Sequence, residues 1–338
     1  MVIGFISDLH VKLYKKNSNF LKHIIKSIDD FNDICKKRKV DFVFMLGDIF
    51  HLKDTVAVEA QHEALFALRK IMTSFPTYMI PGNHDILSKG DAKINGLSIF
   101  RDSCNFFDDY GFFDAGSFRF HFLPYFNDQI IIQKLNEVKY DSNKKNVLCT
   151  HLGLKGFDLD NGHEDIYSEL DINSLGNDFY KIFSGHYHSF QNRGKMTYVS
   201  SPYESHFGDE GQHGWTFYDT DKDTIEFIPN DNSPRFISFE LTSKNMKLIN
   251  DTKNSFIKLI IKKNIDSSLL IQYREKLLKN GNFDVFFEWD LAKSSQKIAV
   301  AKDWESIVSS NPEDILKSYI NDNNFDIDKK ELLAYLDL

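Results

Sequence analysis

Residues 42–51 read FVFMLGDIFH, and no other stretch says more about the fold. The first five residues are apolar and β-forming, so they predict a buried strand that ends directly at Gly47 and Asp48. Polar residues that follow such a strand lie at the sheet edge where open α/β folds place their active sites. The stretch therefore predicts an α/β fold with a functional site at one edge of its sheet.

Four other short segments repeat this arrangement, and most of them follow a run of apolar residues. They are residues 8–10 (DLH), 82–85 (GNHD), 150–151 (TH) and 185–188 (GHYH). Together with Asp48 they supply enough carboxylate, amide and imidazole groups for two metal ions. Such a mixed set of oxygen and nitrogen ligands suits Mn, Fe or Zn better than Mg alone.

Strands and helices alternate through the first two thirds of the chain. Apolar residues at helical spacing predict helices over 17–36 and 57–73, between strands over 2–7, 41–46 and 77–80. This alternation implies a mostly parallel sheet with right-handed crossovers. Further strands are expected over 117–126, 146–150, 180–184, 197–200, 214–219 and 224–229. The predicted fold is a layered α/β sandwich.

The residues after the last of these strands differ in composition. Asn, Asp, Ser, Thr and Lys dominate residues 230–253, which indicates a boundary. Beyond it we expect a strand over 256–262, a helix over 267–279 and a strand over 283–289, then short helices over 303–309, 312–321 and 328–338. The predicted organisation is a main domain over 1–232, a small α/β cap over 250–295 and a helical tail over 300–338.

Composition restricts the class of protein. The 338 residues are 42% hydrophobic, which allows a sizeable core and argues against disorder. The apolar runs are too short to cross a bilayer and no basic segment precedes the first strand, so we expect a soluble protein without an export signal. Three cysteines without a CxxC pair suit a reducing compartment, and we expect a cytoplasmic location.

The charge balance argues against a protein that binds DNA unaided. The chain has 49 acidic and 41 basic residues, with a pI near 5.8, whereas such proteins usually show a basic face. Bound divalent cations or a basic partner could offset the negative charge locally. The dense basic run at residues 36–39 ends a predicted helix, where it suits the helix dipole better than it suits a phosphate contact.

The spacing of the motifs indicates how two ions could be held. Ions about 3.5 to 4 Å apart can activate water and stabilise both the attacking and the leaving oxygens of a phosphate ester. Asp48 is the natural bridging carboxylate, because the small Gly47 lets backbone and metal approach closely. Asp8 and His10, two positions apart, could both face one ion. His186 and His188 are also two positions apart, and Asn83 and His151 complete the set of ligands. The sequence thus predicts a dinuclear metal phosphoesterase.

The ordered motifs DxH, GDxx(D/H), GNHD, a later histidine and GHxH resemble those of the calcineurin-like metallophosphoesterase superfamily. Within it, the chain resembles the SbcD family, the nuclease subunit also known as the meiotic recombination eleven protein. This resemblance depends on DLH at the N-terminus, on His51 in GDIFH where many relatives have a second Asp, and on the residues after Pro229. The length and residues 224–230 (TIEFIPN) resemble the short exonuclease subunits of T-even phages.

The resemblance implies a four-layer sandwich of two mixed β-sheets flanked by helices. One ion would be held by Asp8, His10, Asp48 and His188, and the other by Asp48, Asn83, His151 and His186. Three more residues would have catalytic roles. His84 would contact the scissile phosphate and assist the leaving oxygen, and His51 would help to position the phosphate. Asp85 would orient His84 through a hydrogen bond that fixes its tautomer.

The implied activity is that of a manganese-dependent DNA nuclease, with Mg as an alternative cofactor. The family degrades duplex DNA from 3′ to 5′ and cuts single strands and hairpins, in DNA end processing, recombination and repair. Implied partners are DNA, an SbcC-type coiled-coil ATPase and a second copy of the chain, paired through helices of the first half. Apolar residues of 300–338 would dock on the ATPase, and a phage-encoded protein would act in the host cytoplasm.

Other interpretations remain open. Enzymes with the same set of metal ligands also hydrolyse small phosphodiesters such as cyclic nucleotides, and phosphoproteins. Alternatively, the chain could act mainly as a subunit that tethers DNA ends for its ATPase partner. A histidine near a strand end is more often structural than a ligand. We assign six histidines to the surface or to packing: His23, His62, His121, His163, His206 and His213. The aromatic residues within 106–113 are expected in the core rather than stacked on bases.

Overall fold

Two six-stranded β-sheets form the centre of the computed structural model, which describes residues 1–13, 18–51, 55–209, 211–242, 245–262 and 267–290. The strands of the first sheet lie in the order β14 (Thr224–Pro229), β13 (Gly214–Asp219), β1 (Val2–Ile6), β2 (Phe42–Leu46), β3 (Thr77–Ile80) and β6 (Asn105–Phe106). β1, β2, β3 and β6 are parallel, and β13 runs antiparallel to both of its neighbours. The sheet is therefore mixed, with the expected parallel centre.

The second sheet is also mixed. Its order is β11 (Gln191–Arg193), β12 (Met196–Tyr198), β10 (Lys181–Gly185), β9 (Lys145–His151), β8 (Phe118–Leu123) and β7 (Gly111–Ala115). The four inner strands are parallel and the two edge strands are antiparallel to them. Within the first sheet, β3 is connected to β6 by a hairpin of β4 (Ile86–Ser88) and β5 (Asp91–Asn95) and by the short helix η2 (Gly96–Phe100).

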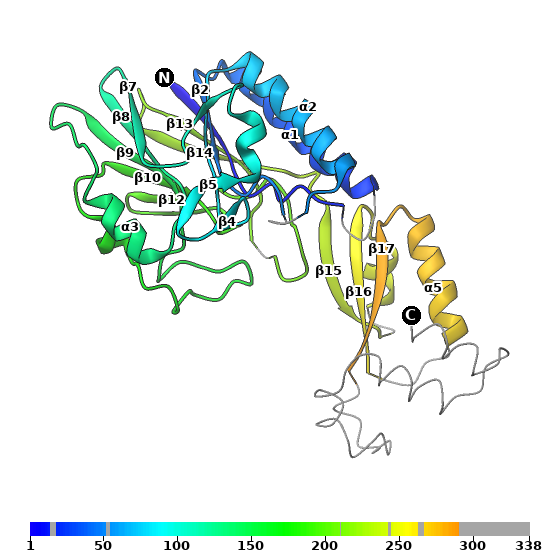
Figure 1. Ribbon diagram of the computed structural model, residues 1–338. Helices are drawn as coiled ribbons and strands as arrows, with labels where there is room; N and C mark the ends of the chain where they lie inside the picture. Colours follow the sequence, from blue (N-terminus) through cyan, green and yellow to red (C-terminus); the bar gives the residue numbers. More distant parts are fainter. Residues whose placement is uncertain (14–17, 52–54, 210, 243–244, 263–266, 291–338) are drawn as a thin grey trace, which may run out of the picture. The chain divides into compact units, whose positions relative to one another are not determined.

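Helices cover the outer face of the first sheet (Figure 1). α1 (Ser18–Arg38) and α2 (Val58–Ser74) pack there over one apolar cluster. α3 (Asp128–Leu135) and η3 (Ile172–Leu175) pack with loops on the second sheet, over another cluster. A third cluster lies between the sheets, where the rings of Phe5 and Phe183 stack at 4.3 Å. This order of layers confirms the predicted four-layer sandwich.

The pattern of α1 explains why this segment is a helix on the sheet. Phe20, Ile24, Ile28 and Phe31 recur every three or four residues and are all buried. The basic run lies in the last turn, where positive charge stabilises the helix dipole. Within the described part of the chain, no helix has the length and apolar character that a membrane crossing requires.

The aromatic residues between Phe106 and Phe113 are half-buried, and Phe107 and Phe113 pack toward the space between the sheets. The ring of Phe107 is parallel to that of Phe122 at 4.8 Å, and Phe113 stacks on Tyr78 at 4.1 Å. Both phenylalanines pack against the cluster between the sheets. These contacts agree with the expected core role of this segment.

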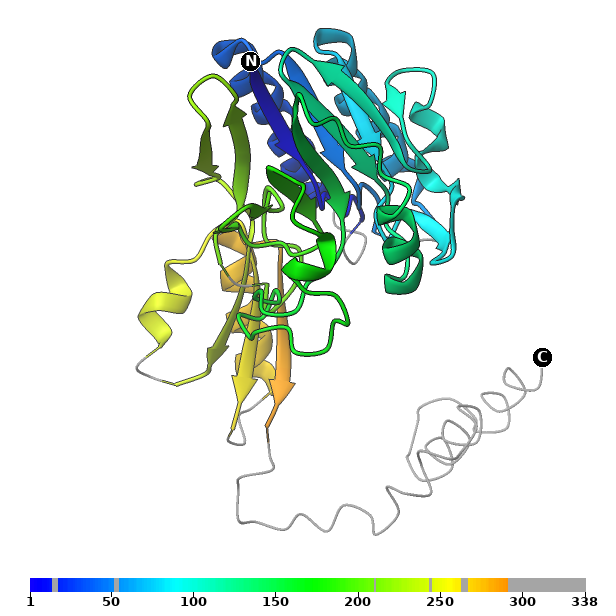
Figure 2. The ribbon, with the colours of Figure 1, turned by 90° about the vertical axis from the view of Figure 1, so that its left-hand side faces the viewer.

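A smaller sheet of three parallel strands follows the two large ones (Figure 2). It contains β15 (Arg235–Glu240), β16 (Ser255–Ile261) and β17 (Asp284–Trp289), with α4 (Met246–Asn250) and α5 (Ser267–Lys279). β15 lies where we expected only a boundary, so that expectation was wrong for these residues. Its Phe236 stacks on Phe256 at 4.7 Å and meets Phe20 of α1 edge-on, a contact that the polar composition of 230–253 concealed.

The small sheet and the main sandwich are packed together. Met1–Trp289 form one compact unit, in which Phe236 and Phe256 join the cluster under α1. A separate small cluster, centred on Ile257, Leu259 and Val285, holds the sheet against its helices. The proposed division at residues 232 and 250 remains a prediction, and the helical tail expected over 300–338 lies outside the described residues.

Candidate metal centre

Backbone hydrogen bonds join the motifs that follow β1 and β2. The two strands are parallel neighbours, so the loops after them leave the sheet side by side. Asp8 N donates to Gly47 O at 3.0 Å, and His10 N donates to Asp48 O at 2.9 Å. These bonds hold the side chains of Asp8 and His10 next to that of Asp48.

Left-handed backbone conformations aim these side chains. The φ angle is 53° at Asp8, 42° at His10 and 52° at Asp48. For residues other than glycine such conformations cost roughly 1–3 kcal/mol each, and they persist at functional sites where the surroundings over-determine them. Gly47 has a φ of 88°, and a Cβ there would come within 2.5 Å of Gly82 N. The close approach expected at Gly47 is therefore present.

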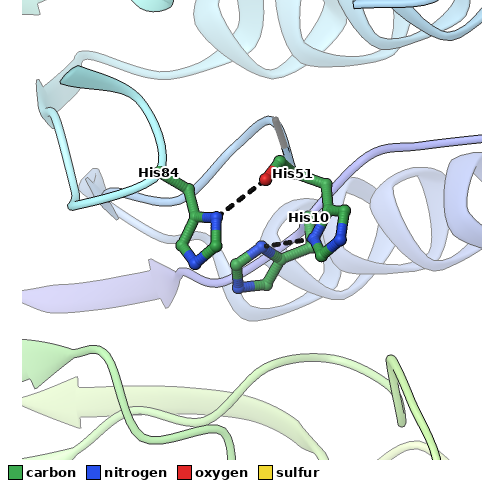
Figure 3. Close-up of side chains that lie close together, drawn as sticks. All are labelled: His10, His51 and His84. Atoms are coloured by element: carbon green, nitrogen blue, oxygen red, sulfur yellow. Dashed lines mark hydrogen bonds between the residues drawn. The ribbon is translucent and has the colours of Figure 1, made fainter. Parts of the chain in front are cut away.

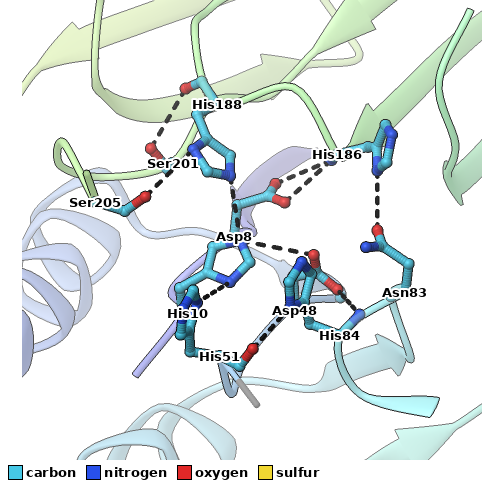
Figure 4. A network of polar contacts seen from close by, with 12 residues as sticks. Asp8, His10, Asp48, His51, Asn83, His84, His186, His188, Ser201 and Ser205 are labelled. Atoms are coloured by element: carbon cyan, nitrogen blue, oxygen red, sulfur yellow. Dashed lines mark hydrogen bonds and ion pairs between the residues drawn. The ribbon is translucent and has the colours of Figure 1, made fainter. Parts of the chain in front are cut away.

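The second sheet brings three imidazoles to the same place, of which Figure 4 labels His186 and His188. His151 ends β9, and His186 and His188 follow β10, its parallel neighbour. His151 Nδ1 donates to Leu46 O at 2.7 Å, and His186 N donates to both carboxylate oxygens of Asp8 at 3.1 Å. Because these bonds cross from one sheet to the other, the site exists only where the two sheets pack together.

One group of potential metal ligands consists of Asp8, His10, His188 and one oxygen of Asp48. The Nε2 atoms of His10 and His188 lie 3.1 Å apart, and His10 Nε2 lies 3.6 Å from Asp48 Oδ2. One donor atom from each of Asp8, His10 and His188 lies within 4.8 Å of the other two. All four side chains are buried.

A second group is formed by Asn83, His151 and His186. Asn83 Oδ1 lies 3.0 Å from His151 Nε2 and 2.9 Å from His186 Nδ1. His151 Nε2 lies 3.5 Å from Asp48 Oδ2, the same oxygen that approaches His10 in the first group. Asp48 therefore stands between the two groups, in the position that a bridging carboxylate requires.

The spacing and chemistry of these atoms fit two divalent ions. Two ligands about 2.1 Å from one ion and at right angles to each other lie about 3 Å apart. The separations of 2.9, 3.0 and 3.1 Å within the groups match this value. Imidazole nitrogens mixed with oxygens suit Mn, Fe or Zn. All seven expected ligands thus lie together, and their individual coordination roles remain a prediction.

Burial and neighbouring charges set the protonation of these groups. Burial lowers the pKa of His10 well below its ordinary value, and burial together with His151 lowers the pKa of His186 to about 4. Burial acts likewise on His151, but the carboxylates of Asp48 and Asp8 outweigh it and raise that pKa to about 9. Burial would raise the pKa of Asp48, yet the nearby imidazoles hold it below its usual range. Asp48 is therefore ionised, as cation binding requires.

Two further histidines line the cavity beside the ligand groups (Figure 3). His84 Nδ1 donates to the carbonyl of His51 at 2.7 Å, and His51 Nδ1 lies 3.4 Å from His10 Nδ1. If His10 binds an ion through Nε2, its proton is on Nδ1 and is directed at His51 Nδ1, so that His51 carries its own proton on Nε2. Because these contacts use the Nδ1 atoms, the Nε2 atoms of His51 and His84 are available to hydrogen-bond a substrate.

Asp85 does not orient the His84 ring directly, which corrects our expectation. The ring nitrogen of His84 is bound by the His51 carbonyl instead. The Asp85 carboxylate accepts hydrogen bonds from backbone N–H groups of two loops: those of Asp48 at 2.6 Å, Gly82 at 2.9 Å, Ile49 at 3.1 Å and Phe50 at 3.3 Å. Burial and the charge of Asp48 raise the pKa of Asp85 to about 7. Asp85 therefore fixes the loop that carries Asp48.

Two carboxylates that the sequence did not reveal hold His188. His188 Nδ1 donates to Asp209 Oδ2 at 3.1 Å, and Asp160 Oδ2 lies 3.4 Å from the same nitrogen. A carboxylate on one imidazole nitrogen fixes the tautomer and turns the other nitrogen toward a metal. Burial lowers the pKa of His188, but Asp209 and Asp160 outweigh it and raise the pKa to about 10. Neither carboxylate lies in a motif, and only the folded chain brings them to His188.

A cavity of about 610 Å³ opens over the ligand groups. Loop residues 159–161 and 205–208 form one wall of it. This wall includes His206, whose Nε2 lies 3.7 Å from Asp160 Oδ2. His206 therefore lies beside the ligand groups, and its assignment to the surface or to packing remains a prediction. The other five histidines that we set aside do not line this cavity: His23, His62, His121, His163 and His213.

Comparison with known proteins identifies the family. The model of calcineurin-like phosphoesterases matches residues 1–225, so the chain belongs to this family. Exonuclease subunit 1 of Enterobacteria phage T4 is 24% identical over 245 residues, which are 68% of each chain. "Putative phosphoesterase 244L" of Invertebrate iridescent virus 6 is 23% identical over 290 residues, 78% of this chain and 95% of the relative.

Among solved structures, a dimetal phosphatase from Danio rerio matches with a TM-score of 0.42 and 12% identity, over 64% of this chain and 91% of that chain. The functional class follows from the family and from the donor atoms of this chain. The protein is a metal-dependent hydrolase of ester bonds, with a site for two divalent ions built from His and Asp ligands.

Proposed function

We propose that the chain is a manganese-dependent DNA nuclease of the SbcD type, which degrades duplex DNA from 3′ to 5′ and cuts single strands and hairpins. The observation that carries the proposal is the pair His51 and His84 in the cavity wall beside the bridging Asp48. This pair offers two imidazole Nε2 atoms to a phosphodiester. The similarity to the T4 exonuclease subunit supports DNA as the substrate class.

The chain's own residues hold and orient the reacting phosphate. When bound, two divalent ions polarise the phosphate oxygens and lower the pKa of the attacking water. His84 keeps its Nδ1 hydrogen bond to the His51 carbonyl when it is protonated, so its second proton is on Nε2 and can pass to the leaving ester oxygen. His51 donates from Nε2 to a phosphate oxygen that stays on the product.

The proposed partners are a second copy of the chain and an SbcC-type coiled-coil ATPase. The net charge of −8 favours help from a basic partner, because DNA is a polyanion. α2 exposes Val58 and Phe66, which supports pairing through the helices of the first half. We propose that the protein acts in the cytoplasm, or in the host cytoplasm for a phage protein. Docking of the ATPase on residues 300–338 remains a prediction.

Cleavage of end-labelled duplex DNA by the purified chain, with Mn²⁺ or Mg²⁺, tests this proposal. We expect shortening of the labelled strand with Mn²⁺ that is lost in His84→Ala and retained in His163→Ala, a variant of an exposed histidine outside the cavity. Full activity of His84→Ala would contradict the assigned role. Faster hydrolysis of cyclic AMP than of DNA by the wild-type chain would favour a small-substrate phosphodiesterase instead.

A further inference from the structure

A second cavity, of about 480 Å³, lies beside the metal centre. It is lined by His186, Gly153, Tyr125 and Leu152, by Asn127, Asp128 and Gln129 at the start of α3, and by Lys89, Ser168 and Glu169. His186 also lines the cavity over the ligand groups, so this one side chain separates the two spaces. The volume suits a small organic ligand.

The imidazole of His186 presents a different nitrogen to each side. Its Nδ1 lies 2.9 Å from Asn83 Oδ1, within the second ligand group. Its Nε2 is turned away from Asn83 (Figure 4) and lies close to Gly153, where a Cβ would approach it to 3.1 Å. Gly153 lines the second cavity, and no hydrogen bond joins Nε2 to another described residue. When Nδ1 binds a metal, the proton lies on Nε2 and points at this cavity.

The charges in the second cavity indicate which ligand it suits. Lys89 contributes one positive charge, whereas Asp128 and Glu169 contribute two negative charges. This balance opposes a second phosphate group but leaves several acceptors and amide donors for an uncharged polar ligand. The ring of Tyr125, which lies 6.1 Å from that of His186 at 26°, adds an aromatic surface. A sugar and base carry the matching hydrogen-bonding groups and ring.

From these contacts we infer that the second cavity binds the nucleoside on one side of the scissile phosphate, with His186 Nε2 as a donor to it. The inference rests on the proposed nuclease function, in which a nucleoside lies on each side of the reacting phosphate. It gives His186 two tasks, metal binding through Nδ1 and substrate binding through Nε2. A small phosphoester without a nucleoside would not need this cavity.

Two cavity-filling variants from different segments of the chain test the inference. Gln129→Trp on α3 and Glu169→Trp in the loop before η3 both change exposed residues that line the cavity. Gln133→Trp is the matched control, since Gln133 is exposed one turn further along α3 and does not line the cavity. For each variant, KM and kcat are measured on a single-stranded oligonucleotide and on methyl 4-nitrophenyl phosphate, a diester without a nucleoside.

We expect both filled variants to raise KM for the oligonucleotide about tenfold or more, the usual scale for loss of one bound base. Hydrolysis of methyl 4-nitrophenyl phosphate, metal content and the Gln133→Trp control should match the wild type. An unchanged oligonucleotide KM in both filled variants would overturn the inference. Equal losses on both substrates would also overturn it, because the cavity would then belong to the metal centre.

A separate measurement distinguishes failure of the inference from failure of the proposed function. If the wild-type chain does not cleave DNA, the nuclease proposal fails. Inhibition of methyl 4-nitrophenyl phosphate hydrolysis by thymidine still tests the cavity in that case. Thymidine inhibition that weakens in the filled variants, with inhibition by inorganic phosphate unchanged, would support a nucleoside site. Thymidine inhibition that is absent or unchanged would refute it.

Discussion

The two large sheets contribute to the metal centre in different ways. Loops of the first sheet supply every expected oxygen ligand and one expected imidazole ligand: Asp8, His10, Asp48 and Asn83. Loops of the second sheet supply imidazoles alone: His151, His186 and His188. Three of the four residues in the first set have left-handed φ angles, as His186 of the second set also has, and main-chain hydrogen bonds join the loops of the first set to each other.

The imidazoles of the second sheet are oriented by residues distant in the sequence. His151 Nδ1 is bound by the carbonyl of Leu46, and His188 Nδ1 by the carboxylate of Asp209. The loops of the oxygen-rich half are thus joined to one another through main-chain groups and through the Asp85 carboxylate. The imidazole half depends on side chains and carbonyl groups that reach it only in the folded protein.

Asp48 links the two halves, so its loss should have the largest effect. Asp48→Ala removes the oxygen that lies within 3.6 Å of both His10 Nε2 and His151 Nε2. We expect this variant to lose bound metal and its cleavage rate to fall by several orders of magnitude. Asp48→Asn keeps a side-chain oxygen near His84 N but removes the charge, and should also lose metal. Metal content after dialysis measures both effects. Retention of two ions by Asp48→Ala would contradict the bridging role.

His84→Ala should separate the chemistry from the assembly of the two halves. His84 belongs to neither ligand group and is proposed to assist proton transfer, so we expect kcat to fall by about 10² or more while both ions are retained. The measurement is single-turnover cleavage of DNA together with metal analysis of the same preparation. Loss of metal in this variant would show that His84 supports the site rather than the reaction.

Asp209→Asn tests whether the imidazole half depends on distant residues. Weakening the acceptor on His188 Nδ1 should lower the affinity of the ion nearest His188 by about 10–100-fold and leave the other ion bound. Titration calorimetry with Mn²⁺ resolves the two binding events. Asp158→Asn is the control, because the Asp158 side chain forms an ion pair with Arg193 at the surface. This variant should bind both ions as the wild type does. Equal weakening of both ions would contradict a specific role in orienting His188.

Asp165 supports the second-sheet half without contacting a ligand. Burial would raise its pKa, but hydrogen bonds from Ser168, Tyr187 and Tyr167 outweigh this and lower it to about 2. A pKa that is lower in the folded than in the unfolded chain stabilises the protein above the unfolded pKa of about 4, and this stabilisation is lost as pH falls toward 2.

Asp165→Asn should therefore lower the free energy of unfolding by roughly 2 kcal/mol at pH 7. The difference from the wild type should shrink as the pH falls through 3, because the carboxyl of the unfolded wild-type chain then takes up a proton while that of the folded chain is still ionised. Urea unfolding at pH 7 and pH 3 measures it, with Asp158→Asn as an exposed control. A difference of the same size at both pH values would mean that the carboxylate charge is not responsible.

The sequence predicted the alternating elements of the sandwich because their periodicity is local. β3, β13, β14 and α5 have the predicted bounds. β15 was missed, since its six residues lie among polar neighbours and are stabilised by Phe20 and Phe256 from elsewhere. The short strands β4, β6, β7 and β11 were also missed. They are defined by pairing with a neighbouring strand, and their own sequences show no clear periodicity.

The class of chemistry could be predicted from the sequence alone, because the order of carboxylate, amide and imidazole residues at strand ends indicated two metal ions and a phosphoester. The tertiary structure decided how those residues are held. It turned Asp85 toward the loop of Asp48 instead of toward His84, placed Asp209 on His188, and gave the two nitrogens of His186 different surroundings. The physical reason is that strand-end motifs fix residue types locally, whereas hydrogen-bond partners depend on how two sheets pack.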